Sequence, residues 1–87
     1  MNLDNLWQTT LEKLQEHVSQ GEYILCLRDS QALSLENDVL VVGTETRYAR
    51  EYLRCRLKDV IEGTVTGILD RPVRLHFEMF ENNGSRT

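Results

Sequence analysis

Histidine and cysteine side chains supply most catalytic bases, nucleophiles and metal ligands, and this chain has two of each. His17 is expected near the end of a helix and His76 on the polar side of a strand, and neither has a cysteine or histidine partner at ligand spacing. Cys26 and Cys55 lack CxxC spacing and lie among aliphatic residues, which favours two buried free thiols. The sequence therefore predicts no metal site.

Other catalytic patterns are also missing. Glu12, Glu16 and Glu22 are expected on helix surfaces, where charged residues are common. No glycine-rich loop follows a strand and opens a helix, as a phosphate cradle requires. We therefore expect no catalytic residue, no cofactor and no enzymatic activity, and we look for binding surfaces instead.

One candidate surface is cationic. Its four members repeat at intervals of three, four and four along one expected helix: Arg47, Arg50, Arg54 and Lys58. These side chains could contact phosphates, which would make the domain a weak single-stranded nucleic-acid binder. Against this, Tyr48 and Tyr52 lie at the other border of the apolar side, Glu51 and Asp59 can pair with the cations, and the net charge is −4. A solvated, ion-paired surface is the favoured interpretation.

The second candidate surface is apolar and contains the only tryptophan of the chain. Leu6, Trp7 and Leu11 lie close together on an amphipathic stripe near the N-terminus. A tryptophan on such a stripe commonly packs in the core, but tryptophan is also enriched where proteins bind each other. The spacing alone leaves both interpretations open.

The length of 87 residues predicts one domain with a modest core. We expect residues 1–80 to form this domain and residues 81–87 to form a polar, flexible tail. There is neither an apolar run that could span a membrane nor a signal segment, so we expect no membrane contact and a cytoplasmic location.

The first half of the chain predicts two helices and a hairpin. Asp4 is expected to cap a helix that ends near His17, and Ser19 and Glu22 have the spacing of a capping box that begins a second, very short helix. Asn37-Asp38 separates two strand-like segments. The second of them, residues 39–43, is apolar on both sides, so we expect it at the centre of a sheet.

The second half predicts a long helix and a last strand. Thr44 is expected to cap a helix from about residue 45 to residue 69, whose last turns are weakened by Gly63 and Gly67. Residues 73–79 alternate between apolar and polar side chains, as a half-buried strand does. A right-handed crossover would make this strand parallel to the preceding one. The order α-α-β-β-α-β therefore predicts an α+β fold with a three-stranded mixed sheet covered by helices.

These motifs, in this order, resemble the N-terminal domain of the bacterial replication initiator DnaA over about residues 5 to 80. The resemblance rests on Leu6-Trp7-Gln8 with Leu11, Leu14 and Gln15, on Glu22-Tyr23, Leu27-Arg28 and Leu40-Val41-Val42, on Tyr48-Ala49 with Tyr52-Leu53, and on Pro72-Val73 with Leu75 and Phe77-Glu78. The chain departs from the family at Cys26, where a second tryptophan is usual, and at Thr44-Glu45-Thr46, where a proline and an asparagine usually begin the long helix.

The resemblance implies a KH-like domain that contacts other proteins during replication initiation. Leu6, Trp7 and Leu11 match the positions of self-association, as a weak homodimer, and Glu22 and Tyr48 match positions linked to contact with the replicative helicase and to weak binding of single-stranded DNA. Regulators of initiation are further expected partners. A free-standing regulator that mimics the initiator domain is an alternative that the sequence does not separate from an excised domain.

Overall fold

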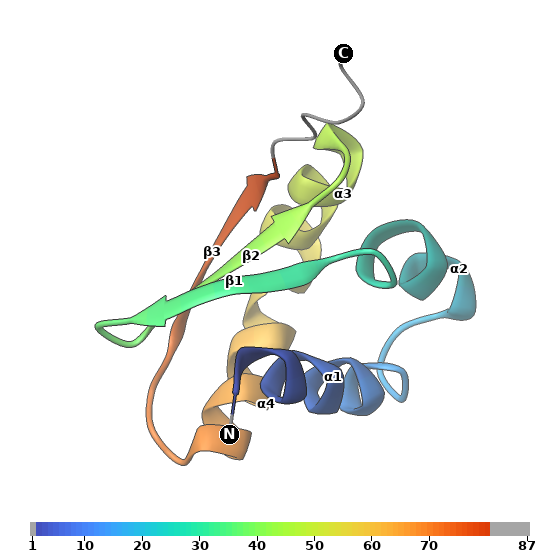
Figure 1. Cartoon of the computed structure of the whole chain (residues 1–87). Coiled ribbons are helices and arrows are strands. Elements are labelled where there is room, and N and C mark those ends of the chain that lie inside the picture. The colour runs from blue at the N-terminus through green and yellow to red at the C-terminus, as the bar shows by residue number, and fades with distance from the viewer. Residues whose placement is uncertain (1, 81–87) are drawn as a thin grey trace.

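The computed structural model describes residues 2–80, and the tail predicted at residues 81–87 lies outside this range. In chain order, helices come before the first strand and between the second and third strands. In space, they cover a three-stranded sheet (Figure 1). The elements are α1 (Leu3–Leu14), α2 (Gln20–Glu22), the π-helical turn η1 (Tyr23–Leu27), β1 (Gln31–Glu36), β2 (Val39–Thr44), α3 (Arg47–Tyr52), the π-helical turn η2 (Leu53–Leu57), α4 (Lys58–Leu69) and β3 (Arg74–Met79). None of the helices in the described range is long and apolar enough to cross a membrane.

The first helix is capped two residues earlier than predicted. Asn2 is the N-cap, because its side-chain oxygen accepts a hydrogen bond of 2.8 Å from the backbone N–H of Asn5. Asp4 instead lies in the first turn, where its charge favours the positive end of the helix dipole. The helix ends at Leu14 and not near His17, so the prediction of its cap and of its end was wrong by a few residues.

The second helix begins with the predicted capping box. The Ser19 hydroxyl accepts a hydrogen bond from the Glu22 backbone N–H at 3.1 Å, and the Glu22 carboxylate accepts one from the Ser19 N–H at 2.8 Å. After one turn, α2 continues as η1, in which the Arg28 N–H donates to the Tyr23 carbonyl oxygen at 2.8 Å. The apolar run of residues 23–27 is therefore one wide helical turn.

The sheet has the predicted topology, with β2 between β1 and β3. β1 pairs antiparallel with β2 through the turn at Asn37 and Asp38, both of which have the positive φ that such a tight turn needs. β2 pairs in parallel with β3, with Leu40 opposite Leu75 and Val42 opposite Phe77. The fold is the expected α+β arrangement with a mixed sheet.

The long helix is divided. Thr46, and not Thr44, is its N-cap, because the Thr46 hydroxyl accepts a hydrogen bond from the Ala49 N–H at 3.0 Å, while Thr44 belongs to β2. The helical path is interrupted by η2, and Leu57 has φ −113° and ψ −3° at the start of α4. Gly63 and Gly67 lie within α4, which continues past both of them to Leu69, so the expected weakening does not end the helix early.

The core lies between the helices and one face of the sheet (Figure 1). Its buried members from β2 and β3 meet side chains from α1, α3 and α4. The fully buried large side chains include Leu6, Leu14, Leu27, Leu40, Leu53 and Ile61. Burial of this apolar surface is the main force that holds the short elements together, because helices of this length are marginal alone.

Candidate functional site

The structure buries the apolar surface predicted near the N-terminus. Leu6, Trp7 and Leu11 all belong to the core, and Trp7 is only 3% exposed. The Trp7 Nε1–H donates a hydrogen bond of 2.9 Å to the Ser30 hydroxyl, which itself donates to the Leu27 carbonyl oxygen at 2.6 Å. In the folded chain these three side chains are therefore packing residues, which decides the alternative that the spacing left open. Self-association itself stays a prediction.

Glu22 and Tyr48 are 26 positions apart in the chain, and both contact Tyr52 in the structure. The sequence did not identify Tyr52 as part of this site. The Tyr52 hydroxyl donates a hydrogen bond to the Glu22 carboxylate. The rings of Tyr48 and Tyr52 are tilted, with centroids 6.0 Å apart. The Arg56 guanidinium lies 5.7 Å from the centroid of the Tyr52 ring, within the range of a cation–π contact. Tyr52 thus connects both predicted contact residues.

Large hydrophobic side chains are exposed on η1, which directly follows Glu22, and on α3, which carries Tyr48 and Tyr52. Leu25 on η1 is 65% exposed, Tyr48 on α3 is 60% exposed, and Ile24 on η1 is 40% exposed. η1 packs against α3, Leu25 follows Glu22 by three positions, and the Tyr48 ring contacts the ring of Tyr52, so Leu25 and Tyr48 lie on the two elements next to the Glu22–Tyr52 contact. We call Glu22, Ile24, Leu25 and Tyr48 the η1–α3 surface.

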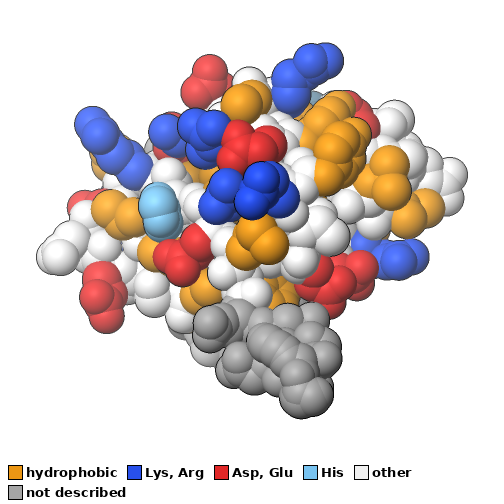
Figure 2. All heavy atoms as spheres, turned by 90° about the horizontal axis from the view of Figure 1, so that it is seen from above, with side chains coloured by type: hydrophobic (Ala, Val, Ile, Leu, Met, Phe, Trp, Pro, Cys, Tyr) orange, Lys and Arg blue, Asp and Glu red, His pale blue; other side chains and the backbone are white. Residues whose placement is uncertain are grey.

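Figure 2 shows the face of the molecule seen from above, with hydrophobic side chains gathered beside cationic and acidic ones. A hollow adjoins the surface where Ile24 meets Val18 and Tyr23. Sequence reasoning missed Ile24 and Leu25. The sequence pattern that could have identified them is the run of five apolar residues at 23–27. A single helical turn cannot direct all five side chains into one core, so some of them must be exposed.

The charges at this surface are set by the same hydrogen bonds. The pKa of Glu22 is lowered, first by the bond from Tyr52 and next by the bond from the Ser19 N–H. The pKa of Tyr52 is raised mainly because its hydroxyl donates to the Glu22 carboxylate. At neutral pH the pair is therefore a phenol bound to a carboxylate anion.

The two cysteines differ from each other. Cys26 is buried, and burial is the main reason that its pKa is raised, which keeps it a neutral thiol. Cys55 is exposed, so the prediction of two buried thiols was wrong for this residue. Its position in η2 turns it away from the core that Leu53 and Leu57 enter.

The predicted cationic surface consists largely of ion pairs. Arg50 and Arg54 both pair with Glu51, and the Arg50–Glu51 distance is 3.0 Å between Nη2 and Oε2. Lys58 Nζ lies 3.9 Å from Glu62 Oε2, and Arg47 is exposed. The prediction of Glu51 as a pairing partner is confirmed, and Glu62 takes the place expected for Asp59. The positive charge available to a phosphate is correspondingly reduced.

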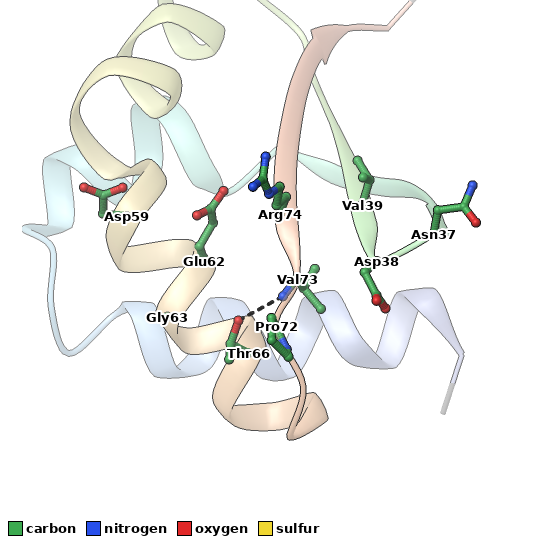
Figure 3. Close-up of a pocket in the computed structure, with 10 residues that line it drawn as sticks. All are labelled: Asn37, Asp38, Val39, Asp59, Glu62, Gly63, Thr66, Pro72, Val73 and Arg74. Atoms are coloured by element: carbon green, nitrogen blue, oxygen red, sulfur yellow. Dashed lines mark hydrogen bonds between the residues drawn. The ribbon is translucent and has the colours of Figure 1, made fainter.

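A second hollow lies between α4 and β3 (Figure 3). Its polar groups are used by the fold: the Thr66 hydroxyl accepts a hydrogen bond from the Val73 N–H at 3.2 Å, and the Glu62 carboxylate accepts one from the Leu75 N–H at 3.0 Å. These bonds satisfy two backbone donors at the start of β3. None of the ten lining residues is a histidine, cysteine or serine.

The family model described as the DnaA N-terminal domain matches residues 4–66. The chain is 34% identical over 89 residues to the chromosomal replication initiator protein DnaA of Nostoc sp., covering 97% of this chain and 19% of that protein. It is 33% identical over 75 residues to the protein of that name from Chloroflexus aggregans, covering 86% of this chain and 16% of the relative. The chain thus spans less than a fifth of the length of these relatives.

Proposed function

The chain belongs to the DnaA N-terminal domain family, and we propose that it is a non-catalytic interaction domain that acts in bacterial replication initiation. Its relatives bear the name of chromosomal replication initiator proteins. The one observation that carries the proposal is the η1–α3 surface, where Leu25 and Tyr48 are more than half exposed beside the Glu22 carboxylate.

This surface has the composition of a protein-binding site. Exposed leucine and tyrosine side chains can become the desolvated centre of an interface, and a charged group such as Arg56 can form part of its rim. Both η1 and α3 are held by the core through Leu27 and Ala49, so the exposed side chains are presented from a fixed base. A preformed surface loses less conformational entropy when it binds.

We propose the replicative helicase as the principal partner, because Glu22 and Tyr48 match the positions that the family resemblance links to helicase contact. The resemblance also links these positions to weak single-stranded DNA binding. The pairing of Arg50 and Arg54 with Glu51 makes the protein partner the better supported of the two.

The test measures binding of the chain to the purified replicative helicase of the same organism by biolayer interferometry. Leu25→Ala and Tyr48→Ala should each weaken binding by about tenfold or more, the effect of removing a side chain from an interface centre. Leu33→Ala is the matched control, since Leu33 is a leucine 40% exposed on β1, away from the η1–α3 surface.

Equal loss of binding in Leu33→Ala and Leu25→Ala would contradict the proposed location. A helicase that does not bind the wild-type chain would contradict the proposed partner. A labelled single-stranded oligonucleotide, titrated at low salt in parallel, tests the alternative ligand: binding that falls with salt and with charge reversal of Arg50 and Arg54 would support a nucleic-acid site instead.

Self-association is a further part of the proposal. Since Leu6, Trp7 and Leu11 are buried, we propose that any contact between copies uses exposed side chains, with Leu25 as the strongest candidate. Sedimentation velocity over a range of concentrations should show a concentration-dependent dimer for the wild type and a monomer for Leu25→Asp. A wild type that stays monomeric at high concentration would remove self-association from the proposal.

A further inference from the structure

Both carboxylate oxygens of Glu22 already accept hydrogen bonds within the chain. Oε1 accepts from the Ser19 N–H at 2.8 Å, and Oε2 accepts from the Tyr52 hydroxyl. The first bond closes the capping box of α2, and the second joins α2 to the last residue of α3. A carboxylate used in this way supports the fold before any partner arrives.

We infer that Glu22 is a positioning residue, which Tyr52 holds so that η1 stays against α3 and the exposed Leu25 and Tyr48 keep their mutual spacing. This inference rests on the proposed function, because it states how the η1–α3 surface is organised for a protein partner. The exposed side chains of Leu25 and Tyr48 would contact the partner, and the Glu22–Tyr52 pair would keep η1 and α3 aligned.

The place of the pair in the fold supports this role. Glu22 immediately precedes η1, and Tyr52 immediately precedes η2. π-helical turns are rare and commonly occur at functional sites, since their wider turn is kept only when the surroundings stabilise it. Within residues 2–80, the Glu22–Tyr52 bond is the one side-chain hydrogen bond that joins α2 or η1 to α3.

The surroundings of Tyr52 fix its ring. Tyr48 packs against it with a centroid distance of 6.0 Å, and the Arg56 guanidinium lies 5.7 Å from its centroid. Leu25 and Cys26 follow Glu22 by three and four positions in the chain. The Leu25 side chain is exposed, and the Cys26 side chain is buried. A change at the Glu22–Tyr52 bond therefore reaches Leu25 on one element and Tyr48 on the other.

The first arm of the test needs no partner. In Tyr52→Phe, NMR titration should show the pKa of Glu22 rising toward its ordinary value of 4.5, because the bond that lowers it most is gone. Amide hydrogen exchange in η1 should become faster. The increase should be about tenfold if the Glu22–Tyr52 bond contributes as much to local stability as one ordinary hydrogen bond. Tyr23→Phe is the matched control, since Tyr23 lies in η1 and its hydroxyl has no hydrogen-bond partner within the described residues.

The second arm measures affinity for the purified replicative helicase. Tyr52→Phe and Glu22→Gln should each weaken binding by about threefold to tenfold, and the double variant should be no weaker than Tyr52→Phe alone, because both changes act on the same Glu22–Tyr52 bond. Glutamine can keep the capping box, so Ser19 remains the N-cap of α2. The dependence of affinity on salt should be the same in wild type and Glu22→Gln, since the carboxylate does not itself pair with the partner.

The outcomes separate the two proposals. Normal affinity in Tyr52→Phe with weakened binding and a reduced salt dependence in Glu22→Gln would overturn the inference, because it would make Glu22 a direct contact. Unchanged exchange of η1 amides and an unchanged pKa of Glu22 in Tyr52→Phe would overturn it as well. If the wild type does not bind the helicase, the proposed function fails while the first arm still decides the positioning role.

Discussion

Trp7 and Tyr48 are both aromatic residues on helices next to the sheet, yet they lie in opposite environments. Trp7 is 3% exposed and its indole N–H is bonded to Ser30, whereas Tyr48 is 60% exposed and its ring contacts another surface tyrosine. α1 packs between β1 and α4, while Tyr48 on α3 is left exposed by the elements of residues 2–80. The residue type most enriched at interfaces is here a core residue, so exposure and not type identifies the candidate contact.

The two regions also differ in how their polar groups are used. Around Trp7, the hydroxyl of Ser30 satisfies a buried donor, and its loss would leave the indole N–H without a partner. Around Tyr48, the polar bonds lie at the surface and connect elements to each other. We therefore expect changes near Trp7 to act on stability and changes near Tyr48 to act on binding.

The largest expected effect is on stability at Trp7. Trp7→Ala should lower the free energy of unfolding by about 3–5 kcal/mol, because it removes a large buried side chain and leaves a cavity. Leu25→Ala should change it by less than about 0.5 kcal/mol, since Leu25 is 65% exposed. Urea denaturation followed by circular dichroism measures both. Should Trp7→Ala fail to fold, Trp7→Phe serves as the second variant, and a cost as small as that of Leu25→Ala would contradict the core assignment.

A matched pair of glycine substitutions extends the comparison between covered and open positions. A Cβ at Gly43 would lie 2.7 Å from Phe80 Cδ2 and 2.9 Å from Leu33 Cδ1, so Gly43→Ala should destabilise the fold by about 1–3 kcal/mol. A Cβ at Gly63 would meet nothing within 4 Å, so Gly63→Ala should stabilise α4 by about 0.5–1 kcal/mol. Thermal unfolding of the two variants should therefore show shifts of opposite sign, and shifts of the same sign would contradict the packing described for these positions.

The smallest expected effect is the pH dependence of the Glu22–Tyr52 bond. The pKa of Glu22 is lowered from 4.5 on folding, so its contribution to stability is present above pH 4.5 and is lost as the pH falls through the folded value. The pKa of Tyr52 is raised from 10.0, so its contribution is present below pH 10.0 and is lost as the pH rises through the folded value.

The difference in melting temperature between wild type and Tyr52→Phe should therefore be constant between about pH 5 and 9 and shrink outside that range. Calorimetry at a series of pH values measures it, with Tyr23→Phe as the control. A difference that keeps its size at pH 3 would show that the Tyr52 hydroxyl does not act through the Glu22 carboxylate.

Local features were predictable because they depend on neighbours in the chain. The capping box at Ser19, the turn at Asn37-Asp38 and the alternation of β3 were all read from short patterns, and the structure contains each of them. The errors are also local: Asn2 was preferred over Asp4 as a cap, and Thr46 over Thr44. In both cases two candidate capping residues lie two positions apart, and helix boundaries read from sequence are uncertain by that much.

The candidate site was only partly predictable. Glu22 and Tyr48 came from the resemblance, and Ile24 and Leu25 were overlooked although their apolar run is visible. Tyr52 was noted as a ring at the border of a helix, with no sign that its hydroxyl would meet Glu22, which precedes it by 30 positions. Contacts at this separation leave no periodic trace in the chain.

The amino-acid sequence by itself determined the fold class, the order of the elements and membership of the family, because apolar periodicity, caps and turns are short-range properties. Only the tertiary structure decided that Trp7 is core, that Leu25 and Tyr48 are exposed, and that Tyr52 joins Glu22 to α3. The physical reason is that burial depends on which elements pack over a side chain. In a chain of this size a helix has too few neighbours to cover every apolar residue that it carries.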